Sequence, residues 1–238
     1  VLGPIWFFVQ PVFTTIVYMF VFGGLAGIST DGIPKPLFYL SGICLWNYFS
    51  ESLTKTSDTF ISNQSIFGKV YFPRLVAPLS IVITGILKMF IQLGLFLIVY
   101  LWVAFTGLPV RINSYAFLFP FLILMIGGMG LGFGLIISSL TTKYRDLKYL
   151  IVFAIQLWMY ATPVIYPLSV MQGKYEKYMW LIQANPVTSI METFKYGFLG
   201  QGTFSWFSLS YSALFTVVVL FSGIIIFNKV ERSFMDVV

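Results

Sequence analysis

Long apolar runs constrain this chain more than any other feature of its sequence. Several of them reach the roughly 18 residues that an α-helix needs to cross a bilayer. Charged residues make up only 9% of the 238 residues, whereas a soluble domain is about one quarter charged. Too few charges are present to cover a surface in water. The sequence therefore predicts an all-α integral membrane protein.

The apolar runs predict six transmembrane helices within a single transmembrane domain, residues 1–238. We expect these spans at Pro4–Ala26, Leu37–Ser62, Leu75–Phe105, Tyr115–Leu140, Tyr149–Tyr166 and Phe207–Phe227. Pro11 lies inside the first span and predicts a bend there. The sequence begins with VLGPIWFF, already within an apolar run, so we expect a further segment upstream.

Basic residues in the connections predict the orientation of the chain. One side of the membrane carries Lys69, Arg74, Lys143, Arg145, Lys148, Lys229 and Arg232. The rule that cytoplasmic loops are rich in Lys and Arg makes this side cytoplasmic. Both termini then lie inside the cell.

The stretch between the fifth and sixth spans does not have the pattern of a plain loop. It holds two short amphipathic pieces, Tyr175–Ala184 and Val187–Leu199, separated at Asn185-Pro186. Each piece is too short to span a bilayer. We expect two short re-entrant helices that enter the outer leaflet from the periplasmic side, where surrounding protein covers their backbone.

A glycine cluster, GGMGLGFG, occupies Gly127–Gly134. Glycines four residues apart are typical of closely packed membrane helices. A phosphate-binding loop is excluded, because no Lys-Ser or Lys-Thr pair follows the glycines. That loop is absent from the whole sequence, and one Cys without any His offers no Cys or His metal site. We therefore expect no cofactor or metal in this chain.

Ionisable residues inside the predicted spans leave two interpretations open. Glu51, Lys55 and Asp58 are spaced four and three apart, so they share one helix face. They form either an ion relay or a wetted helix end that lies against another subunit. Lys88, in the third span, either serves an anionic substrate or pairs within the bundle.

Aromatic residues make up 19% of the chain. Trp and Tyr often mark membrane interfaces, but five aromatic residues fit that role less well. These are Trp6, Phe7, Tyr18, Trp158 and Tyr160. Because aromatic faces make apolar contacts with the C–H faces of sugars, these residues are candidates for the lining of a carbohydrate path.

A basic, aromatic segment, NQSIFGKVYFPRLVAPLS, separates the second and third spans at Asn63–Ser80. It is long enough for one or two helical turns, and Phe67 and Tyr71 would then share a face. A helix on the membrane surface and a docking helix for a soluble cytoplasmic subunit both fit this pattern. A second basic turn, TTKYRDLKY, follows the fourth span.

Five ordered motifs carry a resemblance to a known family. They are VLGPIWFFVQP, FGKVYFPRLVAPLS, YRDLKYL, TPVIYP and NPVTSIMETFKYGFLG. Together they cover nearly the whole chain, which resembles the permease subunit of ATP-binding-cassette exporters of polysaccharides. Members of this family export O-antigen, capsule or wall teichoic acid chains.

The resemblance implies a homodimer of six-span permeases with two separate nucleotide-binding ATPase subunits, which bind ATP and Mg. The substrate would be a lipid-linked polysaccharide, with O-antigen the first choice. It would move from the cytoplasm to the outer face of the bacterial inner membrane. The chain itself would be a transport subunit and not an enzyme, with no nucleic-acid partner.

The resemblance also assigns roles to residues of this sequence. The contacts that couple the permease to the ATPase would be Ser65, Ile66, Phe67, Gly68, Lys69, Val70, Tyr71, Phe72, Arg74, Tyr144, Arg145 and Asp146. The periplasmic gate would include Asn185, Pro186, Glu192, Lys195 and Tyr196.

Three other classes compete with this interpretation. A membrane enzyme acting on lipid-linked sugars needs clustered catalytic groups, but the acidic loop residues are scattered. An ion-driven transporter favours broken spans in corresponding places of two halves, a symmetry that this sequence lacks. A related permease that exports teichoic acid, a drug or another lipid remains the closest alternative.

Overall fold

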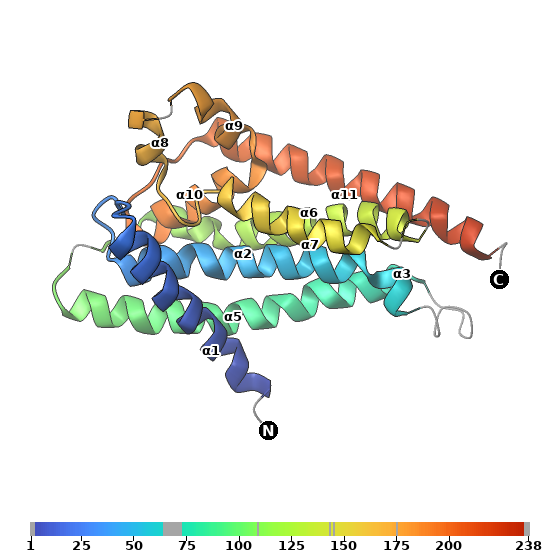
Figure 1. Ribbon diagram of the computed structural model, residues 1–238, viewed down its shortest axis with the longest axis horizontal. Helices are drawn as coiled ribbons and strands as arrows, with labels where there is room; N and C mark the ends of the chain where they lie inside the picture. Colours follow the sequence, from blue (N-terminus) through green and yellow to red (C-terminus); the bar gives the residue numbers. More distant parts are fainter. Residues whose placement is uncertain are drawn as a thin grey trace.

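The computed structural model describes residues 3–63, 73–108, 110–142, 144, 146–174 and 176–235 (Figure 1). In these ranges the chain forms helices joined by turns, and no strand occurs among them. The described part is therefore all-α, as expected. Four long helices run alongside one another: α2 (Lys35–Ser57), α5 (Val76–Phe105), α6 (Phe119–Thr141) and α11 (Trp206–Met235).

Four helical segments of the described chain are long and apolar enough to cross a membrane. They are Ile5–Leu25, Val76–Phe105, Ser114–Thr141 and Trp206–Glu231. These agree with the first, third, fourth and sixth predicted spans. The second predicted span is α2, which is not in this set and carries Glu51 and Lys55 in its polar second half.

Helix α2 lies at the centre of the bundle. Of its 23 residues, 16 are buried, and it packs against α5, α6, α1 (Gly3–Tyr18) and α7 (Leu147–Tyr160). Protein, rather than lipid, thus surrounds most of its surface, so its polar residues lie against other helices. Helix α1 continues through Pro11 and becomes π-helical over Met19–Leu25.

The glycine cluster lets α6 approach two helices closely. A Cβ on Gly132 would lie 2.8 Å from the backbone of Leu220 in α11. A Cβ on Gly134 would lie 2.4 Å from the Cβ of Thr56 in α2. Ordinary side chains do not allow these separations, so the predicted role in close helix packing is confirmed.

The fifth predicted span is shorter as a helix than the sequence suggested. Helix α7 ends at Tyr160, and turns and bends occupy residues 161–166. Pro163 explains this end, because proline has no N–H to donate and disfavours helical geometry at the residue before it. At 1.5 Å per residue, the 14 residues of α7 extend about 21 Å, less than the hydrocarbon core of about 30 Å.

Short helices fill the stretch between α7 and α11. They are α8 (Leu168–Lys174), η3 (Glu176–Tyr178), α9 (Met179–Ala184) and α10 (Pro186–Leu199). The expected break at Asn185 separates α9 from α10 and is confirmed. The remaining short elements are α3 (Thr59–Ser62) and η2 (Ser114–Leu118).

Candidate functional site

An ion pair joins two helices at the end of the bundle where α2 and α6 finish and α5 and α7 begin, which we call the basic end. The Lys148 ammonium donates a hydrogen bond of 2.8 Å to the Asp58 carboxylate. This bond raises the pKa of Lys148 above its ordinary value. The Thr141 hydroxyl bonds to the Ser57 carbonyl at 3.1 Å beside it. The basic end is thus tied together by polar contacts between helices.

Arg74 joins a second pair of helices at the basic end. Its side chain is buried, 6% exposed, and its Nη1 lies 3.4 Å from the Glu231 carbonyl oxygen. The Arg74 Nε lies 3.8 Å from the Glu231 Oε1. Arg74 therefore ties the chain just before α5 to the last turns of α11, a structural role that the sequence did not predict.

Some of the other predicted coupling residues lie in the part of the chain that the structure describes, and the others lie outside it. Tyr144 and Asp146 are exposed at the basic end, immediately before α7. Arg145 lies outside the described residues, and so do all of Ser65, Ile66, Phe67, Gly68, Lys69, Val70, Tyr71 and Phe72.

Glu51 is the centre of a small charged network inside the bundle. Its carboxylate pairs with Lys55 at 2.5 Å and also with Lys88 from α5. The Lys88 ammonium lies 5.0 Å from the centre of the Phe7 ring. Pairing of Lys88 within the bundle, one of its two predicted roles, is confirmed. Asp58 does not join this network, because its partner is Lys148.

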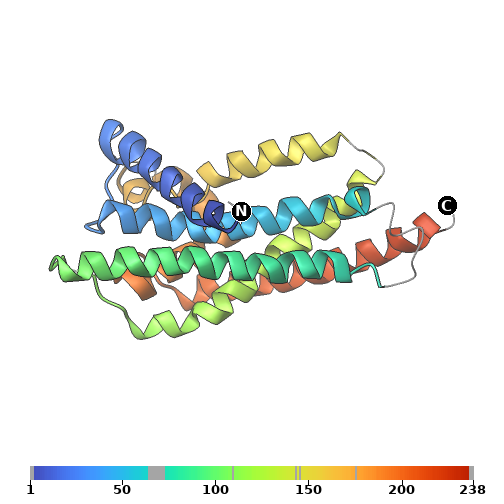
Figure 2. The ribbon, with the colours of Figure 1, turned by 90° about the horizontal axis from the view of Figure 1, so that it is seen from below.

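The five aromatic candidates fall into two groups along α1 and α7. Trp6 and Phe7 line a cavity of about 240 Å³ together with Glu51 and Lys88. Tyr18, Trp158 and Tyr160 lie farther along α1 and α7, where the Tyr18 hydroxyl is 3.5 Å from the Met159 sulfur. Figure 2 shows α1 and α7 on the same side of α2.

Trp158 is held in place by aromatic packing and by one hydrogen bond. Its ring meets Phe49 of α2 edge-on at 5.1 Å and Phe133 of α6 edge-on at 5.4 Å. Its Nε1 donates to the Asn185 side-chain oxygen at 3.2 Å. Tyr160, two residues later, is exposed. Trp158 therefore positions α7, and Tyr160 presents its ring outward.

Asn185, a predicted gate residue, joins α7 to α10. Its Oδ1 accepts from the Val187 N–H at 3.1 Å and so caps α10. The same oxygen accepts from Trp158. Its Nδ2 donates to the Ala161 carbonyl at 3.2 Å and to the Thr162 hydroxyl at 2.9 Å. Pro186 follows it as the first residue of α10, where a missing N–H costs nothing.

Two further gate residues, Glu192 and Lys195, form a buried ion pair in α10. Their side chains are 4% and 2% exposed, and the Lys195 ammonium lies 3.6 Å from the Glu192 Oε1. Lys195 also donates to the Pro163 carbonyl at 2.5 Å and lies 4.1 Å from the centre of the Phe38 ring. The Glu192 Oε2 accepts from the Thr203 N–H at 3.1 Å.

The last gate residue, Tyr196, faces η2 and the segment that leads into α11. Its ring packs against Tyr115 at 5.3 Å and stacks on Phe204 at 5.9 Å. Its carbonyl accepts from the Asn113 side chain at 3.1 Å. Sequence reasoning missed Asn113 and Pro163 as partners of α10, because a contact to a distant backbone carbonyl leaves no pattern in the sequence.

A metal site is not indicated in the part of the chain that the structure describes. Those residues contain no group of three or more Asp, Glu, Cys or His side chains placed to hold an ion. The buried polar groups of α10 and the ion pairs of the basic end are therefore the chemical features to explain.

The sequence pattern described as the ABC-2 type transporter matches residues 1–199, which include all helices from α1 to α10. The chain belongs to the ABC-2 type transporter family. This family places the helices described above in the membrane domain of an ABC transporter. The family assignment also agrees with the resemblance seen in the sequence motifs.

Curated relatives of this ABC-2 family member match along its whole length. It is 29% identical over 241 residues to "O-antigen export system permease protein RfbA" of Klebsiella pneumoniae, covering 100% of this chain and 88% of the relative. It is 28% identical over 236 residues to the protein of the same name from Myxococcus xanthus, covering 99% and 87%. "Polysialic acid transport protein KpsM" of Escherichia coli is 23% identical over 240 residues, covering 98% and 88%.

Proposed function

We propose that this chain is the channel-forming membrane subunit of an ATP-driven exporter of lipid-linked polysaccharide. The substrate is O-antigen, and it moves from the cytoplasm to the outer face of the bacterial inner membrane. The observation that carries the proposal is the similarity over almost the full chain to relatives named O-antigen export permeases. The similarity to a polysialic acid transport protein is lower, yet it supports the same class of substrate.

In this proposal the chain crosses the membrane six times. Helix α2 lies in the second span, and the fifth span is Tyr149–Tyr166, which comprises most of α7 and the turns that follow it. Both termini lie in the cytoplasm, and α9 and α10 are the re-entrant helices on the periplasmic side. Two copies pair and bind two ATPase subunits, which hold ATP and Mg²⁺. The chain itself is not an enzyme, and nucleic acid is not a partner.

The exposed apolar surface of α1 and α7 supports pairing and a path for substrate. Both helices expose large apolar side chains, including Phe13, Ile16, Tyr149 and Phe153. Lipid or a second copy must cover such a surface. We assign the aromatic rings of Trp6, Phe7, Tyr18, Trp158 and Tyr160 to the path, where they contact the C–H faces of sugars.

We assign coupling to the ATPase to the basic end, through Ser65–Arg74 and Tyr144–Asp146. The ion pair of Asp58 with Lys148 joins α2 to α7 at this end. Helix α7 then leads to Trp158, which bonds to Asn185 at the start of α10. A rigid helix with defined partners at both ends is a physical route by which motion at the basic end reaches the gate.

Depletion of the chain in its native cell tests the function. A radiolabelled lipid-linked glycan should accumulate in the cytoplasmic leaflet, and purified complexes should contain equal amounts of the chain and a vanadate-sensitive ATPase. Accumulation of a drug or another lipid instead would overturn the substrate, and a chain purified without any ATPase would overturn the coupling assignment.

Lys69→Glu tests the coupling segment most cleanly. Export should fall while ATP hydrolysis continues, and Lys69→Glu with Arg74→Glu should have the same effect. Because Arg74 is bonded to Glu231, the double variant also disturbs α11, so the single variant decides. Lys177→Glu, on an exposed residue of η3 at the opposite end, is the control and should leave coupling unchanged.

A further inference from the structure

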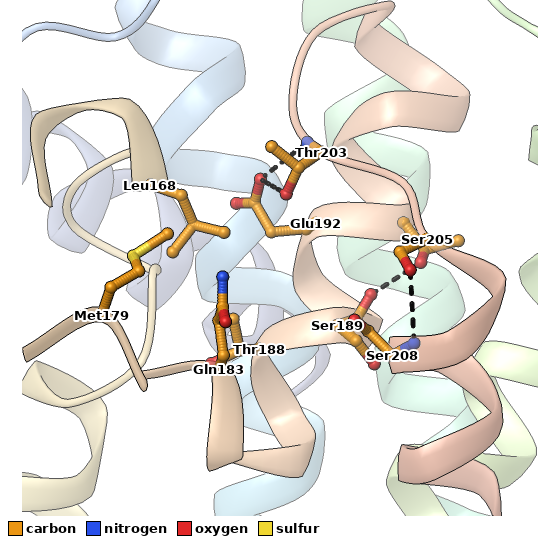
Figure 3. A pocket seen from close by; sticks show the side chains of 10 residues that line it. Leu168, Met179, Gln183, Thr188, Ser189, Glu192, Thr203, Ser205 and Ser208 are labelled. Carbon is orange, nitrogen blue, oxygen red and sulfur yellow. Dashed lines mark hydrogen bonds between the residues drawn. The ribbon is translucent and has the colours of Figure 1, made fainter. Parts of the chain in front are cut away.

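A polar pocket opens beside α10 (Figure 3). Helices α8 and α9, which help to line it, lie at the end of the bundle opposite the basic end (Figure 1). Its volume is about 240 Å³, slightly below the roughly 300 to 1,000 Å³ of pockets that hold drug-sized ligands. Residues of α8, α9 and α10 line it, together with the segment leading into α11 and the first turn of α11. The size suits one small molecule.

Two buried polar atoms at this pocket have no hydrogen-bond partner in the described chain. They are the Thr188 hydroxyl and the Glu192 Oε1, and their residues are 4% and 3% exposed. Buried polar groups are almost always hydrogen-bonded, so each exception needs an explanation. A ligand with hydroxyl groups would satisfy both atoms, since a hydroxyl can donate to a carboxylate and also bond to Thr188.

The two sides of the pocket differ in polarity. In Figure 3, Leu168 and Met179 lie on one side and Ser189, Ser205 and Ser208 on the other, with Glu192 between them. Gln183 lies near Thr188 and adds an amide. A pyranose ring has this same division, with apolar C–H faces and a rim of hydroxyl groups.

The charges near the pocket favour neither of the two simplest kinds of ion. The Glu192 carboxylate is already paired with the Lys195 ammonium, 3.6 Å from its Oε1, so the pair offers no net charge to attract either phosphate or a metal cation. A neutral molecule with several hydroxyl groups is the chemistry that remains.

We propose that this pocket binds one neutral monosaccharide unit. This inference rests on the proposed function, because it makes the pocket a subsite for the exported glycan. Thr188 and Glu192 bond to the sugar hydroxyls, and Leu168 and Met179 contact a C–H face. Helix α10 carries both polar residues. An occupied pocket therefore favours the arrangement of α10 described here.

Saturation-transfer difference NMR on the complete transporter in lipid nanodiscs tests the pocket. The probes are D-galactose, D-mannose and N-acetyl-D-glucosamine, with calcium chloride and sodium phosphate as competitors. The variants are Thr188→Val and Gln183→Leu, each compared with the unmodified chain. Thr56→Val is the matched control, because Thr56 also has a buried hydroxyl without a partner but lies in α2, away from the pocket.

At least one hexose should give a signal, and Thr188→Val should weaken its binding about three- to tenfold, the effect of one hydrogen bond. Gln183→Leu should also weaken it, while Thr56→Val should not. The inference is overturned if no hexose gives a signal, if Thr188→Val binds like the unmodified chain, or if calcium or phosphate displaces the sugar. Glycan export is a separate measurement that tests the proposed function. Failure of the pocket inference and failure of the exporter assignment are therefore distinguishable.

Discussion

Lys148 and Asp58 form an ion pair of 2.8 Å between the start of α7 and the end of α2. Both side chains are partly exposed, so the pair contributes only about 0 to 1 kcal/mol to stability. Lys148→Ala should therefore leave unfolding nearly unchanged. If motion passes through α7, the same variant should export several-fold less glycan for each ATP hydrolysed, measured in vesicles that contain the complete transporter.

The charge-reversed double variant Asp58→Lys with Lys148→Asp is the control for this pair. It restores an ion pair and should recover much of the export. The pKa of Lys148 is raised in the folded chain, so the contribution of its pairing is fully present below the ordinary lysine pKa. That contribution is lost only as the pH rises through the raised value. If Lys148→Ala exports as much glycan for each ATP hydrolysed as the unmodified chain, this ion pair does not carry motion to the gate.

Close packing of α6 on α11 predicts a large effect of one added methyl group. In Gly132→Ala the new Cβ would lie 2.8 Å from the Leu220 backbone, and the backbone of a packed helix has little freedom to move. We expect a loss of about 1 to 3 kcal/mol, measured by unfolding of the purified chain. Gly94→Ala, where nothing lies within 4 Å, should be neutral or slightly stabilising because alanine favours helix.

The sequence was sufficient to predict the features that depend on local pattern. Apolar length placed α5, α6 and α11, glycine spacing predicted the packing of α6, and Asn185-Pro186 predicted the break before α10. Features that depend on tertiary contact were not predictable. The burial of Arg74 against Glu231 requires knowledge of where the last turns of α11 lie. The end of α7 at Tyr160, by contrast, follows from Pro163, a local signal that the length of the apolar run concealed.

In the candidate site, too, features set by local sequence pattern were predictable and features set by tertiary contacts were not. The sequence identified Glu192 and Lys195 as residues of the periplasmic stretch, but their spacing of three indicates only a shared helix face. Their burial, and the contact of Lys195 with the Pro163 carbonyl, follow from how α10 packs. The pocket beside Thr188 left no trace in the sequence, because its lining comes from four separate segments.

The buried pair of Lys195 and Glu192 predicts a strong dependence of stability on both partners. Lys195→Met removes the ammonium and leaves the Glu192 carboxylate buried without its cation, which should cost about 3 to 5 kcal/mol. Adding Glu192→Gln removes the unpaired charge and should recover part of that loss. Lys177→Met, at an exposed lysine, should have little effect. Equal stability of the Lys195 and Lys177 variants in thermal unfolding would contradict the ion-pair role.

Variants of Asn185 separate the contributions that individual hydrogen bonds make to the junction of α7 and α10. Asn185→Ala loses the cap of α10, the bond to Trp158 and both amide donors. Loss of a cap alone costs about 0.5 to 2 kcal/mol, so we expect a total above this range. Asn185→Asp keeps an oxygen for Val187 and Trp158 but loses the donors to Ala161 and Thr162, and should cost less, about 1 to 2 kcal/mol.

Gln201→Glu is the matched control for Asn185→Asp, since it makes the same change from amide to carboxylate at an exposed position just after α10. It should unfold like the unmodified chain. If Asn185→Asp also unfolds like the unmodified chain, the amide donors do not hold α7 against α10. If it is destabilised while export per ATP hydrolysed is unchanged, the junction stabilises the fold without carrying motion to the gate. A loss in both measurements is the outcome we expect, because the same two hydrogen bonds fix α10 to the C-terminal end of α7, the helix whose first turn holds Lys148.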